Sequence, residues 1–247
     1  MALMGAGRRE EALDPIRHVT IWQHGVTTSL AQFAREQLLL IEGPAAAQTR
    51  DPVAVVLSMA AQPDRWKHQP VVWIPTQAVR RMVGMRADAV HASWSEVQEC
   101  RALQNRARAA RRRARAGWPL TAEEQEVVNV RQRVQVLNGL FQQHLHLVPP
   151  SASESGWQPV LLPEGYPPPQ QVSVKRAWAL MLHAVTADDP AALQEASQRF
   201  RVILCNLNPS LETAAGWAPS AGAVSVRVAP RDSGVAMRWS QSYAGMW

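Results

Sequence analysis

Seven arginines stand in a stretch of the chain that holds no acidic residue. The sequence carries no Asp or Glu between Glu99 and Glu123. The arginines of this stretch are Arg101, Arg106, Arg108, Arg111, Arg112, Arg113 and Arg115. A guanidinium group is permanently charged, and its planar fork donates paired hydrogen bonds to phosphate and stacks on bases. These residues predict the binding of a polyanion, with RNA as the first candidate.

The overall charge agrees with that prediction. The net charge is +6 and the isoelectric point is near 10.3, and only Lys67 and Lys175 among the 26 basic residues are lysines. A GC-rich coding sequence also favours arginine, but it would scatter the residue evenly along the chain. The clustering therefore favours phosphate recognition, with an acidic protein partner as the alternative.

Tryptophan is the second unusual residue type. The chain has ten tryptophans against three phenylalanines and two tyrosines. Trp118, Trp157 and Trp217 each follow a glycine in a sequence typical of loops, so we expect them to stack on bases or to anchor a protein interface. Trp94 and Trp178 stand on apolar helix faces, where a role in the core is favoured.

Catalytic and metal-binding patterns are absent from the sequence. We find no nucleophile elbow, Walker loop or dinucleotide fingerprint, and no paired carboxylates in an apolar context. Cys100 and Cys205 are far apart and neither belongs to a CxxC pair, which predicts no disulfide framework, a reducing intracellular location and no metal. The expectation is a non-enzyme without a cofactor. No apolar run approaches the roughly 18 residues of a membrane span, so we do not expect an integral membrane protein.

The arginines are expected on one long helix. Helical spacing of apolar residues from Thr76 predicts a helix of some 40 residues, to Ala116. After Leu103 only alanine separates the arginines, so we expect this half to project into solvent or to lie against a polyanion. Before it, the sequence predicts a helix over 28–43 and short extended pieces at Val53–Leu57 and Val71–Ile74.

Two helical hairpins are predicted. Gly117-Trp118-Pro119 ends the basic helix, and Thr121 with Glu124 forms a capping box for a second helix that runs to Leu145. A helix from Ser173 to Val185 and a partner that begins at Pro190 and runs to Leu207 form the second hairpin. Between the hairpins a proline-rich strap is expected, and after them an extended arm with one edge strand at Val224–Val228.

The predicted fold class is mainly α, with two helical hairpins that include one long basic helix, extended Pro/Gly-rich arms and at most a small β element. We divide the chain into five segments. They are 1–50 (N-terminal arm and helix), 51–148 (short extended pieces and the long-helix hairpin), 149–172 (strap), 173–207 (second hairpin) and 208–247 (C-terminal arm).

Modest cores joined by extended arms are typical of a chain that becomes ordered within a large assembly. The function expected is a non-catalytic structural subunit, an RNA-contacting component of an organellar (mitochondrial) ribosome, with neighbouring proteins bound through the strap and the C-terminal arm. One alternative is an accessory subunit of a large mitochondrial protein or membrane-protein complex, and another is a viral capsid or nucleocapsid protein.

Overall fold

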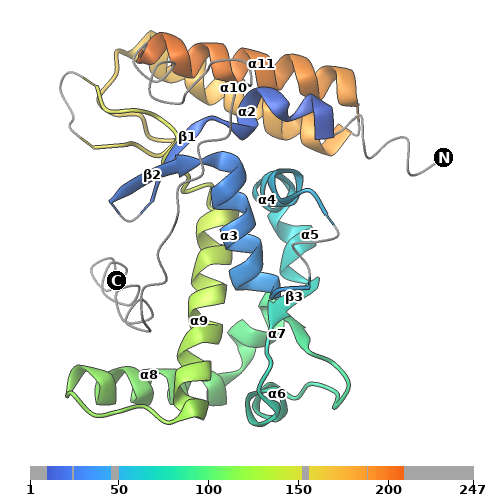
Figure 1. The fold of residues 1–247 in the computed structure, drawn as a ribbon, viewed down its shortest axis with the longest axis vertical. Coiled ribbons are helices and arrows are strands. Elements are labelled where there is room, and N and C mark those ends of the chain that lie inside the picture. The colour runs from blue at the N-terminus through green and yellow to red at the C-terminus, as the bar shows by residue number, and fades with distance from the viewer. Residues whose placement is uncertain (1–9, 24, 46–49, 152–155, 188, 209–247) are drawn as a thin grey trace, which may run out of the picture.

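The computed structural model describes residues 10–23, 25–45, 50–151, 156–187 and 189–208, and it is mainly helical (Figure 1). The helices are α2 (Asp14–Arg17), α3 (Leu30–Glu42), α4 (Pro52–Ala61), α5 (Pro63–Lys67), α6 (Gln77–Val83), α7 (Trp94–Glu99), α8 (Arg101–Arg115), α9 (Ala122–Phe141), α10 (Pro168–Ala187) and α11 (Pro190–Leu207). Antiparallel strand pairs join β1 (Thr20–Gln23) to β2 (Val26–Ser29) and β3 (Pro70–Trp73) to β4 (His91–Ser93). The predicted class, mainly α with a small β element, is confirmed.

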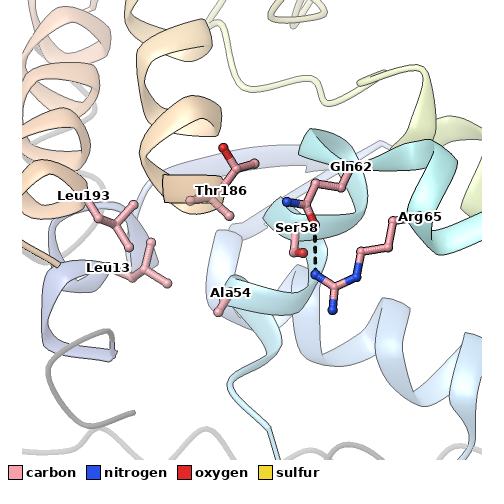
Figure 2. Close-up of a pocket in the computed structure, with 8 residues that line it drawn as sticks. Leu13, Ala54, Ser58, Gln62, Arg65, Thr186 and Leu193 are labelled. Atoms are coloured by element: carbon pink, nitrogen blue, oxygen red, sulfur yellow. Dashed lines mark hydrogen bonds between the residues drawn. The ribbon is translucent and has the colours of Figure 1, made fainter. Parts of the chain in front are cut away.

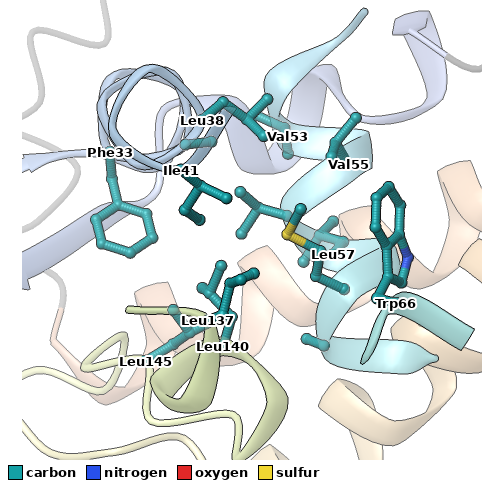
Figure 3. Packing of buried hydrophobic residues seen from close by; sticks show 14 of the residues in the cluster. Phe33, Leu38, Ile41, Val53, Val55, Leu57, Trp66, Leu137, Leu140 and Leu145 are labelled. Carbon is teal, nitrogen blue, oxygen red and sulfur yellow. The ribbon is translucent and has the colours of Figure 1, made fainter. Parts of the chain in front are cut away.

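The core is built around α4. This short helix packs against α3, α9 and α10, and its apolar side chains are buried on several sides (Figure 3). In Figure 3, Leu57 of α4 lies toward Leu137 and Leu140 of α9, and Val53 of α4 lies beside Leu38 of α3. A helix that is apolar nearly all round is stable only when its neighbours enclose it, which explains its central position.

The expectation of an extended piece at Val53–Leu57 is wrong, since these residues belong to α4. Two adjacent residues fix the helix start. The Asp51 carboxylate accepts a hydrogen bond from the Val53 amide (3.0 Å), and Pro52 occupies the first helical position. Burial and capping together outweigh the β-preference of the valines. The extended piece at Val71–Ile74 is confirmed as part of β3 and the residue after it.

The expectation of one helix over 76–116 is also wrong. The chain forms α6, β4, α7 and α8 there, so the basic helix has 15 residues. Gly84 ends α6 in the left-handed conformation (φ +82°), which favours glycine. The strand His91–Ser93 then pairs with β3, and Ser93 caps α7 in a capping box with Glu96.

Both predicted helix pairs are present. Residues 116–121 connect α8 to α9, and the predicted capping box of Thr121 and Glu124 begins α9. α10 packs along α11, where the Trp178 and Phe200 rings lie 5.4 Å apart. α10 begins at Pro168, earlier than the predicted Ser173. Figure 1 shows α8 at the lower end of α9 and the α10–α11 pair at its upper end.

The described part of the strap lies on the chain's own core. Val148 and Gln158 form an antiparallel bridge, Val160 is fully buried, and the Tyr166 hydroxyl donates to the Pro149 carbonyl (2.9 Å). These contacts give the proline-rich segment the surface that it needs in order to be fixed. The edge strand predicted at 224–228 and the rest of the C-terminal arm after residue 208 lie outside the described residues.

Candidate functional site

Helix α8 is held on the body of the protein by small residues. Leu103, Ala107 and Ala110 are buried, and they recur at four and three residues on one side of the helix that packs against α9. Alanine allows two helix backbones to approach closely. The expectation that this half of the basic helix cannot bury itself is therefore wrong, and α8 is a fixed platform.

Two of the seven arginines are paired within the chain. Arg106 and Arg113 lie on one flank of α8, next to the start of α9. The Arg113 guanidinium lies 3.4 Å from the Glu124 carboxylate, and that of Arg106 lies 3.8 Å from Glu123. These carboxylates partly neutralise the two arginines, and the expectation of seven unpaired charges is wrong at both positions.

Four other arginines form what we call the outer face of α8. Successive residues of an α-helix turn by about 100°, so this set lies on the side of α8 opposite Leu103, Ala107 and Ala110. All four are exposed, and none has an ion pair or hydrogen bond from its side chain to any described residue. The outer face consists of Arg101, Arg108, Arg112 and Arg115.

One edge of the outer face meets an arginine from α9. Arg131 is half-buried and donates to the Gln98 side-chain oxygen (2.8 Å), while Arg111 of α8 donates to Gln135 one turn further along α9 (3.4 Å). Burial lowers the pKa of Arg131 below its ordinary value, and the nearby positive charges of Arg111 and Arg108 lower it further.

We call Arg108, Arg111 and Arg131 the cationic cluster. Glutamine oxygens are the only side-chain acceptors that the described residues offer its members, so the mutual repulsion of the three charges is not offset by a carboxylate. A bound anion would relieve that repulsion and accept charge-assisted hydrogen bonds. Arg131 is not among the predicted site residues because it lies outside the arginine run. The predicted hairpin could have indicated Arg131, because a helix that returns along α8 places its own side chains beside the arginines.

The three tryptophans that follow a glycine lie in different environments. Trp118 follows the end of α8 and is 64% exposed. Trp157 is half-buried in the strap, where its carbonyl lies 3.0 Å from His146 Nδ1, so it belongs to a different part of the surface. Trp217 lies outside the described residues. Among the described residues, Trp118 is therefore the one of these three tryptophans that lies next to the arginines of α8.

A pocket of about 310 Å³ lies elsewhere, where α4 and α5 meet α2, α10 and α11 (Figure 2). Its polar side chains are engaged locally. Arg65 donates to Gln62 (3.2 Å), and the Ser58 hydroxyl accepts from the Trp66 indole (3.0 Å). None of the residues that line the pocket is His, Cys, Asp or Glu, so these side chains provide no nucleophile with an adjacent base. The lining residues are Leu13, Ala54, Ser58, Gln62, Arg65, Val185, Thr186 and Leu193.

No protein-family model matches the chain, and no curated protein matches it in sequence. Within the ranges described, no three or more His, Cys, Asp or Glu side chains come together as a metal site would require. In those same ranges every helix is too short or too polar to cross a bilayer. The outer face and the cationic cluster are thus the groups of side chains on which a function can be built.

Proposed function

We propose that this chain is a non-catalytic structural subunit that binds the phosphate backbone of RNA through the outer face of α8 and the cationic cluster. The single observation that carries the proposal is the division of the arginines by helix side. Arg106 and Arg113 meet carboxylates, whereas Arg101, Arg108, Arg112 and Arg115 have no partner among the described residues. A row of unpaired guanidinium groups on a fixed helix suits a row of phosphates.

The spacing supports a polymer rather than a single small anion. From Arg101 to Arg115 the helix rises roughly 20 Å, at about 1.5 Å per residue. A single phosphate group is much shorter than this row of arginines, but a strand of several successive nucleotides has a comparable length. Since the arginines are spread over this length of helix, they would contact different phosphates of one strand.

The assembly proposed is the one that the sequence predicts, an organellar ribosome, with neighbouring proteins on the strap and the C-terminal arm. Acidic subunits or anionic lipid headgroups would be bound by the same outer face in an accessory subunit of a membrane-protein complex, and a capsid protein would package nucleic acid with it. These alternatives differ from the proposal in the ligand or in what the purified chain assembles into.

The direct test measures the affinity of the purified full chain for a labelled RNA as salt is varied. The variant carries Arg108→Gln, Arg112→Gln and Arg115→Gln. Each phosphate contact on a single strand contributes about 0.7 to the slope of log K against log salt, so we expect the variant's slope to fall by about 2. The affinity at low salt should fall with it.

A control variant with the same loss of charge separates a local effect from a general one. Lys175, Arg176 and Arg199 are exposed on α10 and α11, at the other end of the molecule, and have no ion pair with any described residue (Figure 1). Their change to glutamine should leave the salt slope as it is in the natural chain. Equal effects of the two triple variants would show that only net charge matters and would refute the proposed site.

A further inference from the structure

Helix α8 ends in a tight, hydrogen-bonded motif that fixes the residue after it. The Gly117 amide donates to the Ala114 carbonyl (3.1 Å), and the Trp118 amide donates to the Arg113 carbonyl (3.0 Å). Gly117 adopts the left-handed conformation at φ +78°, as the motif requires. This arrangement folds the chain back over the last turn of the helix, so the backbone of Trp118 is held next to the turn that carries Arg112 and Arg115.

The Trp118 side chain makes no hydrogen bond and no ring contact with the described residues. Its indole is 64% exposed, its N–H has no hydrogen-bond acceptor among the described residues, and no described ring or cation packs on it. Two other tryptophans, by contrast, have an acceptor for the indole N–H. The Trp94 indole donates to Asn138 and the Trp178 indole donates to Gln143, each at 2.8 Å. An exposed aromatic ring beside a row of cationic side chains is suited to stacking on a nucleotide base.

Charge around Trp118 favours a nucleotide over a protein as its partner. The preceding turn presents the exposed Arg112 and Arg115, and the outer face continues behind them. Protein interfaces also use tryptophan and arginine, but a row of like charges without interspersed carboxylates, next to an aromatic platform, is the combination found in sites for single-stranded nucleic acid. Bases in a duplex are already stacked on one another, so an aromatic side chain can stack only on a base that is unpaired.

We propose that Trp118 stacks on an unpaired base while Arg112 and Arg115 hold the adjoining phosphates, so that the nucleic acid bound at the end of α8 is single-stranded. This inference rests on the proposed function and narrows its ligand class. The outer face would contact the phosphate backbone of either a single strand or a duplex. The Trp118 indole would add the preference for unpaired nucleotides.

The test compares Trp118→Leu with Trp118→Phe on two labelled RNAs of equal length, one unstructured and one a perfect duplex. Leucine keeps an apolar side chain but cannot stack, so we expect Trp118→Leu to weaken binding of the single strand by about tenfold. Binding of the duplex should change by less than about twofold, since it depends on phosphates. Trp118→Phe should keep most of the affinity for the single strand, because a ring remains.

Trp22→Leu is the matched control, because Trp22 is also partly exposed (36%) but lies on β1 and not next to α8. Its ring lies 5.6 Å from the ring of His146. It should bind both RNAs as the natural chain does. If Trp118→Leu weakens both RNAs equally, or neither, the stacking inference is wrong. The proposed function fails separately, if the triple arginine variant and the natural chain bind RNA with the same salt slope.

Discussion

At the scale of single residues, Arg131 and Arg133 show how position decides what an arginine does. Both lie on α9, two residues apart. Arg133 is buried, donates to Glu126 (2.6 Å) and to the Leu40 carbonyl (3.0 Å), and lies over the Trp73 ring at 5.2 Å. Its charge is fully satisfied inside the protein. Among the described residues, Arg131 meets only a glutamine oxygen and two like charges, so no described carboxylate neutralises it.

The two positions should differ in how strongly Arg→Met changes the free energy of unfolding. Removal of one partner from a buried ion pair leaves an uncompensated charge, so Arg133→Met, which strands Glu126, should lower the free energy of unfolding by about 3–5 kcal/mol. Arg131→Met relieves repulsion and loses one hydrogen bond, so its effect on stability should stay within about 1 kcal/mol. Urea denaturation measures both. A small effect at Arg133 together with a large one at Arg131 would contradict this assignment of roles.

At the scale of elements, the start of α9 joins folding to the organisation of the arginines. The Glu124 carboxylate accepts the Thr121 amide (3.0 Å) and lies 3.4 Å from the Arg113 guanidinium. The pKa of Glu124 is lowered from its ordinary value of 4.5, first by the hydrogen bond from the Thr121 backbone and then by the charge of Arg113. One side chain therefore caps α9 and fixes the flank of α8.

A lowered carboxyl pKa predicts how stability depends on acid. The stabilisation from Glu124 is complete above its unfolded value of 4.5 and is lost as the pH falls through its lower folded value. Glu124→Gln should therefore reduce stability at about pH 7 and flatten the loss between about pH 5 and about pH 3. The measurement is urea denaturation across this range. Glu195→Gln, at an exposed position on α11, serves as the control, and an unchanged acid profile in Glu124→Gln would contradict the prediction.

Local signals in the sequence predict both helix pairs and three helix starts, although α10 begins before the predicted Ser173 and α9 ends before the predicted Leu145. Ser29, Thr121 and Asp189 each cap a helix that the sequence predicted, because a cap depends only on residues within one turn. The same kind of cap at Asp51-Pro52 marks the start of α4, although the valines that follow favour an extended piece. The end of α8 also followed from Gly117.

Long-range pairing explains the remaining errors. The apolar spacing from Thr76 to Cys100 fits a helix, but β4 lies inside that range and pairs with β3, a contact that no local pattern reveals. At the site, the charges of Arg106 and Arg113 could be judged only against Glu123 and Glu124 of the next helix. The residue types predict a cationic helix. The packing of α9 against α8 determines which arginines of α8 are paired with carboxylates.

At the scale of the whole molecule, the outer face and the core occupy different regions. α8 lies at one end of α9, beyond the packed centre formed by α3, α4 and α9 (Figures 1 and 3). The remaining part of the described surface carries apolar residues that are scattered singly, such as Val26 on β2, Leu162 in the strap and Val172 on α10. The proposed binding of a polyanion to the outer face would therefore leave the core undisturbed.

That separation makes a prediction for the chain in its native assembly. In a cell extract the tagged full chain should sediment with large ribonucleoprotein particles, and nuclease should shift it to light fractions. The change of Arg108, Arg112 and Arg115 to glutamine should produce the same shift without nuclease, because the fold of α8 depends on Leu103 and alanines rather than on these arginines. The triple variant on α10 and α11 should stay in the heavy fractions. Release by detergent, with nuclease having no effect, would instead assign the outer face to lipid or to an acidic subunit.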